Sequence, residues 1–137
     1  VKFNKETQKL VRQSSAFQVL PGLHANGELT VTENLADVGG IAFAYGALSK
    51  YLKEHPEEDK VIDGFTQSQR CFIAWGQIWS DKLREGFLRQ ITATNAHAAG
   101  QYRAFAAAQH EPEFFKAFGI QPGDPMWLAP KDRARIW

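Results

Sequence analysis

The sequence predicts a mainly α-helical protein, and three observations support this fold class. Apolar residues recur at steps of three and four between Leu35 and Leu52, which is the spacing of one helix face. No segment shows the strict alternation of apolar and polar residues that is typical of a half-buried strand. Glycine, proline and asparagine separate the periodic segments. The 137 residues suffice for one domain, residues 1–137, with its own apolar core.

In the first half of the chain the pattern predicts two helices. Residues 2–18 carry scattered apolar side chains among polar ones, which is typical of a surface helix, and Pro21-Gly22 ends it. A loop over residues 23–29 follows. Thr30 or Thr32 is expected to cap the second helix, which continues to the segment that begins at His55-Pro56.

The second half is expected to hold three more helices. The longest runs from about Thr66 to Arg84, and its inward face carries Phe72, Trp75, Trp79 and Leu83. Shorter helices are expected over residues 98–109 and 113–118. The remaining tail, from Gly119 onward, is rich in proline and glycine and is expected to be irregular.

The composition excludes several classes of function. The 16 basic and 15 acidic residues nearly cancel, and no basic stripe points to nucleic acid. No apolar run approaches the roughly 18 residues that a membrane-spanning helix needs. The sequence shows no signal peptide. The single cysteine, Cys71, lies beside apolar residues, which favours a small core residue over a nucleophile.

Glu33 and Asp37 are the first candidates for chemistry. They stand four residues apart in a helical context, so both carboxylates lie on one face of the helix, just before Gly39-Gly40. Such a pair suits a metal site in which one acid binds the ion and the other orients a neighbouring ligand. Two structural alternatives remain open: Glu33 forms a capping box with Thr30, and Asp37 is a solvated helix residue.

His97 and Arg103 are further candidates, six residues apart. His97 precedes an expected helix, where it is either a loop residue or a donor to an oxyanion. Arg103 is either an exposed helix residue or a fork of donors for a carbonyl or carboxylate. His110-Glu111 does not continue into His-Glu-x-x-His, since Phe114 stands at the fifth position. The sequence therefore contains no complete zinc site.

Taken together, four stretches resemble the C-terminal part of the neprilysin-type zinc metallopeptidases, the family of neprilysin, endothelin-converting enzyme and bacterial oligopeptidases. The order and spacing of these stretches hold from about Phe3 to the last residue. They are Asn26 to Gly40 with its Glu-x-x-x-Asp segment, the aromatic helix from Phe72 to Trp79, His97 with Arg103, and the ending Arg135-Ile136-Trp137.

This resemblance implies a fold and a set of roles. The fold would be the helical C-terminal portion of a thermolysin-like (gluzincin) catalytic domain. Glu33 would be the third ligand of Zn²⁺, and Asp37 would orient a zinc-binding imidazole and serve in proton donation. His97 would stabilise the tetrahedral transition state. Arg103 would bind a backbone carbonyl of the peptide substrate. The reaction would be attack of a zinc-activated water on a peptide bond.

The chain departs from the family pattern in three places. Asn95 stands where the family usually has aspartate, which would weaken stabilisation of an imidazolium at His97. Ala134 stands where animal members have cysteine, so the chain looks like a bacterial, disulfide-poor member. The His-Glu-x-x-His segment is absent, and we therefore expect an inactive piece of a larger peptidase that does not bind zinc tightly.

The expected partners follow from the same resemblance. They are peptide substrates and the upstream half of the chain's own catalytic domain, whose removal would expose apolar surface around Phe72, Trp75 and Trp79 and favour self-association. Bacterial members of the family are often exported or associated with the cell envelope. The alternative hypothesis is a stand-alone, non-catalytic helical module that binds peptides or proteins, with Arg103 lining its groove.

Overall fold

The computed structural model describes residues 2–136 and is mainly helical, as the sequence predicts. The first helix, α1 (Lys2–Ala16), leads into a short hairpin of two strands, β1 (Gln18–Leu20) and β2 (Leu23–His24). The strands pair antiparallel, and Gly22 turns the chain between them with a φ of 74°. This hairpin occupies part of the segment that was expected to be a loop, since two strands of three and two residues are too short to show a periodic pattern.

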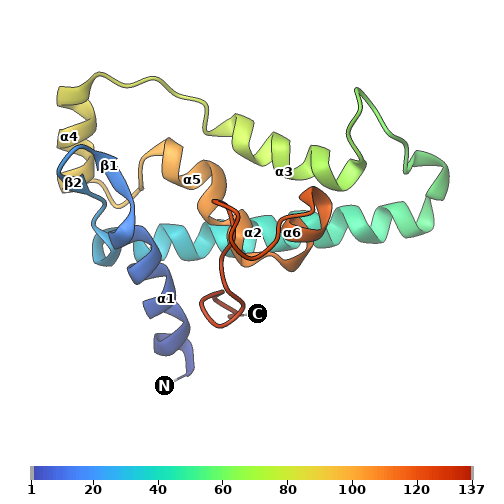
Figure 1. Ribbon diagram of the computed structural model, residues 1–137, viewed down its shortest axis with the longest axis horizontal. Coiled ribbons are helices and arrows are strands. Elements are labelled where there is room, and N and C mark those ends of the chain that lie inside the picture. The colour runs from blue at the N-terminus through green and yellow to red at the C-terminus, as the bar shows by residue number, and fades with distance from the viewer. Residues whose placement is uncertain (1, 137) are drawn as a thin grey trace.

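Helix α2 (Gly27–Glu54) is the longest element and runs along the molecule (Figure 1). It begins earlier than expected. Asn26 is its cap, and the Asn26 side chain accepts a hydrogen bond from the backbone N–H of Leu29 at 3.1 Å. The expectation of a cap at Thr30 or Thr32 is therefore wrong. Since Glu33 lies well inside the helix, the capping-box alternative for Glu33 is excluded as well.

The crossing of α1 and α2 explains why α2 begins at a glycine. A Cβ atom built on Gly27 would lie 2.2 Å from the carbonyl oxygen of Val11 and 2.5 Å from the hydroxyl of Ser15. Only a residue without a side chain lets the two backbones approach this closely. The contact fixes where α2 starts against α1, and with it the position of every side chain further along α2.

A short 3₁₀ helix, η1 (Pro56–Glu58), follows α2 and leads to α3 (Gln67–Ile78). Thr66 caps α3 in a complete capping box with Gln69. The expected helix to Arg84 is too long: α3 ends at Ile78, and the chain turns at Trp79, whose N–H reaches back to Gly76. A separate helix, α4 (Glu85–Thr94), follows and was not predicted, because Arg84 provides no side-chain cap to mark its start.

The last elements are short. Helix α5 (Gly100–Ala106) and the 3₁₀ helix η2 (Ala108–His110) occupy the segment expected to be one helix. Helix α6 (Pro112–Phe118) begins with a proline and ends at Gly119, which takes the left-handed conformation with a φ of 64°. Within residues 2–136 no helix is both long enough and apolar enough to cross a membrane.

The core lies where α1, α2, α3 and α6 meet, and aromatic rings make up much of it. The Phe72 ring stacks on Tyr45 at 5.2 Å between centroids and meets the edge of Phe114 at 5.3 Å. The other buried members are Leu10, Val38, Ile41, Ala107, Ala108, Phe115 and Ala134. Phe72 is 5% exposed, so the expectation that its side chain lies on an exposed apolar surface is wrong, whereas Trp75 and Trp79, which were named with it, are half-buried. The Phe72 side chain is covered by residues of this chain.

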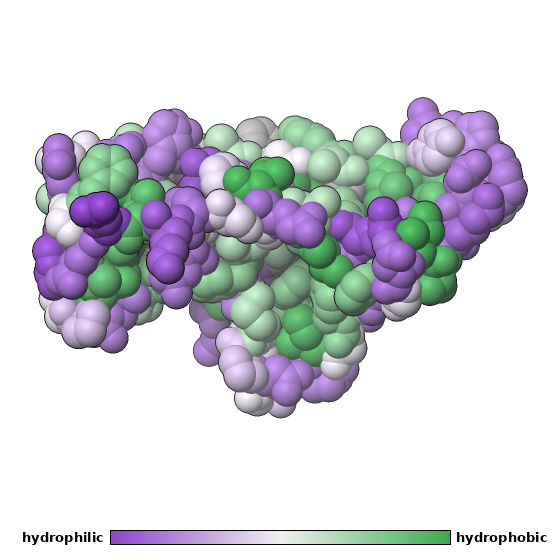
Figure 2. Space-filling view, turned by 90° about the horizontal axis from the view of Figure 1, so that it is seen from above, coloured by the Kyte–Doolittle hydropathy of each residue, from purple (hydrophilic) through white to green (hydrophobic). Residues whose placement is uncertain are grey.

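Large apolar side chains are exposed elsewhere. They include Phe43 on α2, Val61, Ile62 and Phe65 in the connection before α3, Ile78 at the end of α3, and Phe87 on α4. Figure 2 shows hydrophobic surface in several separate places between hydrophilic side chains on one face of the molecule. Self-association through such surface stays a prediction.

Candidate active site

Glu33 and Asp37 lie on the N-terminal half of α2, one helical turn apart. They differ in environment. Asp37 is buried, with 8% of its surface exposed, whereas the Glu33 side chain is about one-third exposed at 34%. Each carboxylate contacts one residue from the second half of the chain. The helix thus presents one acid at the surface and one acid beneath it.

Asp37 and Arg103 form a two-pronged ion pair between α2 and α5. The Nε and one terminal nitrogen of Arg103 each donate to a different oxygen of Asp37, both at 2.7 Å. The side chains are 10% and 13% exposed, so solvent screens the pair little. This fork geometry is the strongest form of arginine–carboxylate recognition. It holds the guanidinium in one orientation.

Two tryptophans also contact Arg103: Trp75 of α3, and Trp79, which directly follows the last residue of α3. The guanidinium carbon lies 3.7 Å from the centre of the Trp79 ring, which is close enough for a cation–π contact. The indole N–H of Trp75 donates to the backbone carbonyl of Arg103 at 3.0 Å. The sequence placed both tryptophans on one helix face but did not show that they face Arg103. Their spacing of four residues was the available signal.

His97 lies between Glu33 and Asn95. Its Nε2 is 3.0 Å from a carboxylate oxygen of Glu33, and its Nδ1 is 3.1 Å from Oδ1 of Asn95. The same Asn95 oxygen accepts the backbone N–H of His97 at 2.9 Å, which fixes the orientation of the amide. In its protonated form, the ring would offer a donor to each oxygen. Asn95 therefore orients the ring as an aspartate could, without contributing a charge.

The four residues singled out from the sequence thus come together in two pairs, Glu33 with His97 and Asp37 with Arg103. Residues 33 and 37 lie on the same face of one helix because they are four residues apart. Residues 97 and 103 reach them from a segment more than sixty residues later. The readings of Arg103 as an exposed helix residue and of Asp37 as a solvated one are excluded by their burial.

The donor chemistry at Glu33 fits a zinc ligand, because a carboxylate that is one-third exposed and lies against an imidazole is accessible to a metal ion. The described residues contain no group of three or more His, Cys, Asp or Glu side chains that would complete such a site. Burial raises the pKa of the Cys71 thiol, and the thiolate is the form that binds metals.

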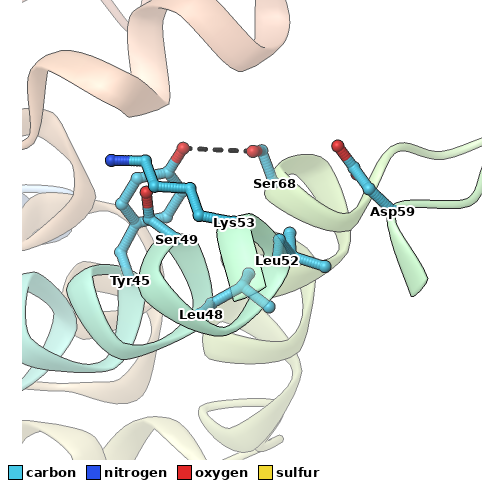
Figure 3. Close-up of a pocket in the computed structure, with 7 residues that line it drawn as sticks. All are labelled: Tyr45, Leu48, Ser49, Leu52, Lys53, Asp59 and Ser68. Atoms are coloured by element: carbon cyan, nitrogen blue, oxygen red, sulfur yellow. Dashed lines mark hydrogen bonds between the residues drawn. The ribbon is translucent and has the colours of Figure 1, made fainter. Parts of the chain in front are cut away.

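Two other features lie apart from these pairs. His110 is buried and bonded to Gln13 and to the backbone of Ala134, which is a structural role. An open pocket of about 200 Å³ lies further along α2, between the second half of that helix and the start of α3 (Figure 3). Its lining includes Tyr45, Lys53, Asp59 and Ser68. None of the predicted site residues lines this pocket.

Comparison with known proteins identifies the family. The model of peptidase family M13 matches residues 1–134. Neprilysin-21 of Caenorhabditis elegans is 33% identical over 141 residues, which cover 99% of this chain and 18% of the relative. Human neprilysin is 30% identical over 139 residues, with coverage of 98% of this chain and 18% of the relative. The chain thus spans less than a fifth of the length of these relatives.

Solved structures of the same kind share the fold. The zinc metalloprotease Zmp1 of Mycobacterium tuberculosis superposes with a TM-score of 0.88 at 31% identity, covering 99% of this chain and 21% of that chain. PepO from Lactobacillus rhamnosis HN001 gives a TM-score of 0.79 at 27% identity, covering 98% of this chain and 20% of the PepO chain. The helical fold and the resemblance to neprilysin-type peptidases are confirmed, and the chain belongs to peptidase family M13.

Proposed function

We propose that this chain forms one wall of the active site of a zinc-dependent endopeptidase, with Glu33 as a zinc ligand. The observation that supports this most directly is the pairing of Glu33 with His97 beside the buried Asp37–Arg103 pair. When bound, Zn²⁺ acts as a Lewis acid toward the peptide carbonyl and activates water as the nucleophile. The remaining two zinc ligands and the general base would come from another part of the protein.

Asp37 is suited to orienting a histidine that binds zinc. Each of its oxygens accepts one hydrogen bond from Arg103, and a carboxylate has about four acceptor positions in total. Both oxygens therefore retain capacity for an imidazole N–H. An outer carboxylate of this kind fixes the tautomer and direction of a metal-binding histidine. The buried ion pair keeps the carboxylate in place for that contact, and the same carboxylate is our candidate for the role in proton donation.

Arg103 and His97 are suited to binding the substrate. Arg103 has five N–H donors, of which two bond to Asp37, so the others remain available for a backbone carbonyl of a peptide. The Trp79 ring limits where the guanidinium can move. His97 presents Nε2 toward Glu33 and would donate to the oxyanion as it develops, which is the usual use of an oriented donor at such a site.

Replacing Glu33 by glutamine in the full-length protein tests the proposal. We expect zinc content and kcat/KM to fall by more than the 10- to 100-fold that is typical of losing an outer contact to a ligand. Metal analysis and peptide hydrolysis measure the two effects. Glu28→Gln is the matched control, since Glu28 lies in the first turn of the same helix and is exposed. Full zinc content and activity in the Glu33 variant would contradict the assignment.

The 137-residue chain alone is expected to bind zinc weakly and to hydrolyse no peptide. Its sequence contains no His-Glu-x-x-His, and catalytic zinc normally takes three protein ligands. Titration calorimetry of zinc into the monomeric chain checks the first expectation. Stoichiometric binding at submicromolar concentration would show that these 137 residues hold a complete site and would count against a shared one.

A further inference from the structure

Asn34 is buried between the two acidic site residues of α2, with 5% of its surface exposed. The orientation of its amide is fixed by Thr30. The Nδ2 of Asn34 donates to the Thr30 hydroxyl at 3.0 Å, and that hydroxyl donates to the carbonyl of Asn26 at 3.0 Å and lies 3.2 Å from the hydroxyl of Ser14. The carbonyl oxygen of the Asn34 side chain must therefore point away from Thr30.

That carbonyl oxygen, Oδ1, is buried and has no hydrogen-bond partner among the described residues. Leaving such an acceptor unpaired costs about 1–3 kcal/mol. A small cavity that Asn34 helps to line offers about 10 Å³ of space for the centre of a water molecule. Its polar lining residues are Gln13, Asn34, Asp37, Tyr102 and Arg103. The size is close to the minimum that one water needs.

Gln13 cannot satisfy Asn34, because its own amide is fully used. Its Nε2 donates to Ala106 and to Gln109, and its Oε1 accepts from Tyr102 and lies 2.9 Å from a ring nitrogen of His110. Tyr102 likewise directs its hydroxyl hydrogen to Gln13 at 3.1 Å. Asn34 Oδ1 and the carboxylate of Asp37 are thus the acceptors with remaining capacity among the polar lining residues, and a water that donates to both would suit them.

We propose that this cavity binds one ordered water molecule, which donates to Asn34 Oδ1 and to the carboxylate of Asp37. The water would be a third donor to the carboxylate that already accepts two bonds from Arg103. Asn34 is then a positioning residue, which acts through the water on the Asp37–Arg103 pair. This second step rests on the proposed function of that pair, whereas the water site itself does not.

The water site is tested by a crystal structure of the full-length protein at a resolution that shows ordered solvent. We expect density for one water within hydrogen-bond distance of Asn34 Oδ1 and Asp37. In Asn34→Leu, which removes the acceptor and fills the cavity, that density is expected to be absent. A dry cavity in the unsubstituted protein, or an Asn34 Oδ1 bonded directly to a protein group, would overturn the proposal.

The positioning role is tested by peptide hydrolysis. Asn34→Leu is expected to raise KM about tenfold with a smaller change in kcat, in the range known for outer contacts. Asn34→Ser, which keeps a polar group and room for water, is expected to restore most of the affinity. If Asn34→Leu does not fold, the water density in the unsubstituted protein still tests the water site, and the KM of Asn34→Ser still tests the positioning role. Unchanged KM in a folded leucine variant would overturn the positioning role and leave the water site standing.

Discussion

Replacing Arg103 by glutamine is expected to lower the free energy of unfolding of the chain by about 3–5 kcal/mol. The reason is the carboxylate that remains. Asp37 is 8% exposed and accepts two hydrogen bonds from Arg103, so the variant leaves a buried charge without a cation. The guanidinium also loses its contact with Trp79. Urea unfolding followed by tryptophan fluorescence measures the change.

Two companion variants separate burial from charge pairing. Arg89→Gln removes a bond of the same 2.7 Å length to Glu85, but both side chains are exposed, so at most about 0.5 kcal/mol is expected. The double variant Asp37→Leu with Arg103→Met removes both buried charges and is expected to regain most of the stability. If Arg103→Gln lowered the free energy of unfolding by as little as Arg89→Gln, the result would contradict the prediction and show that water reaches Asp37.

Acidification from about pH 6.5 to pH 4 is expected to cost the chain about 3 kcal/mol through His110 alone. Burial lowers the pKa of this histidine to about 4, and the nearby charges of Lys9 and Arg133 act in the same direction, while Glu6 opposes them. The unfolded chain takes up the proton near pH 6.5. Because the unfolded state binds more protons in this window, stability falls as the pH falls.

The contacts of His110 explain the effect. Its Nδ1 accepts the backbone N–H of Ala134 at 2.8 Å, and its Nε2 donates to Gln13 at 2.9 Å. A proton on Nδ1 would remove the first bond, which holds the C-terminal segment against η2. We expect His110→Gln to flatten the pH dependence of urea unfolding between pH 4 and pH 6.5. The same substitution at the exposed His55, His55→Gln, is the matched control.

Two carboxylates modify this pH dependence in opposite directions. Hydrogen bonds from Lys9 and from the backbone of Arg135 lower the pKa of Glu6, so its contribution is lost as the pH falls through that lowered value. Burial raises the pKa of Glu111, so protonation of this group favours the folded state on acidification. A slope that persists between pH 4 and pH 6.5 in His110→Gln would contradict the leading role of His110.

The partners of Glu33 and Asp37 show which part of the candidate site could be predicted from the sequence. Helical periodicity placed Glu33 and Asp37 on one face, and the resemblance to neprilysin-type peptidases drew attention to His97 and Arg103. Neither revealed that Arg103 is locked by Asp37 and Trp79, because these contacts join residues far apart in the chain. The last residue of the resemblance, Trp137, lies outside the described residues. The functional roles of the four site residues remain proposals.

The wrong predictions of helix ends and of burial have a common physical cause, which is that tertiary contacts decide both. Thr30 and Thr32 are also capping residues by type, so residue type does not single out Asn26, and the close contact of Gly27 with α1 accompanies the observed start of the helix. The break between α3 and α4 has no proline or glycine to mark it. Removal of the upstream half was expected to expose the inward face of its helix at Phe72, yet Tyr45 and Phe114 cover this ring.

By itself the sequence predicted the helical class, the family and the acidic pair, since these depend on residue type, on spacing within one helix and on the order of short motifs along the chain. The tertiary structure alone decided which partners those side chains take and which are buried. Burial and pairing depend on how α2, α3 and α5 pack, and packing joins residues whose separation in the chain carries no periodic signal. Glu33 and Asp37 are alike in sequence, and only the packed helices make one accessible and the other part of a buried ion pair.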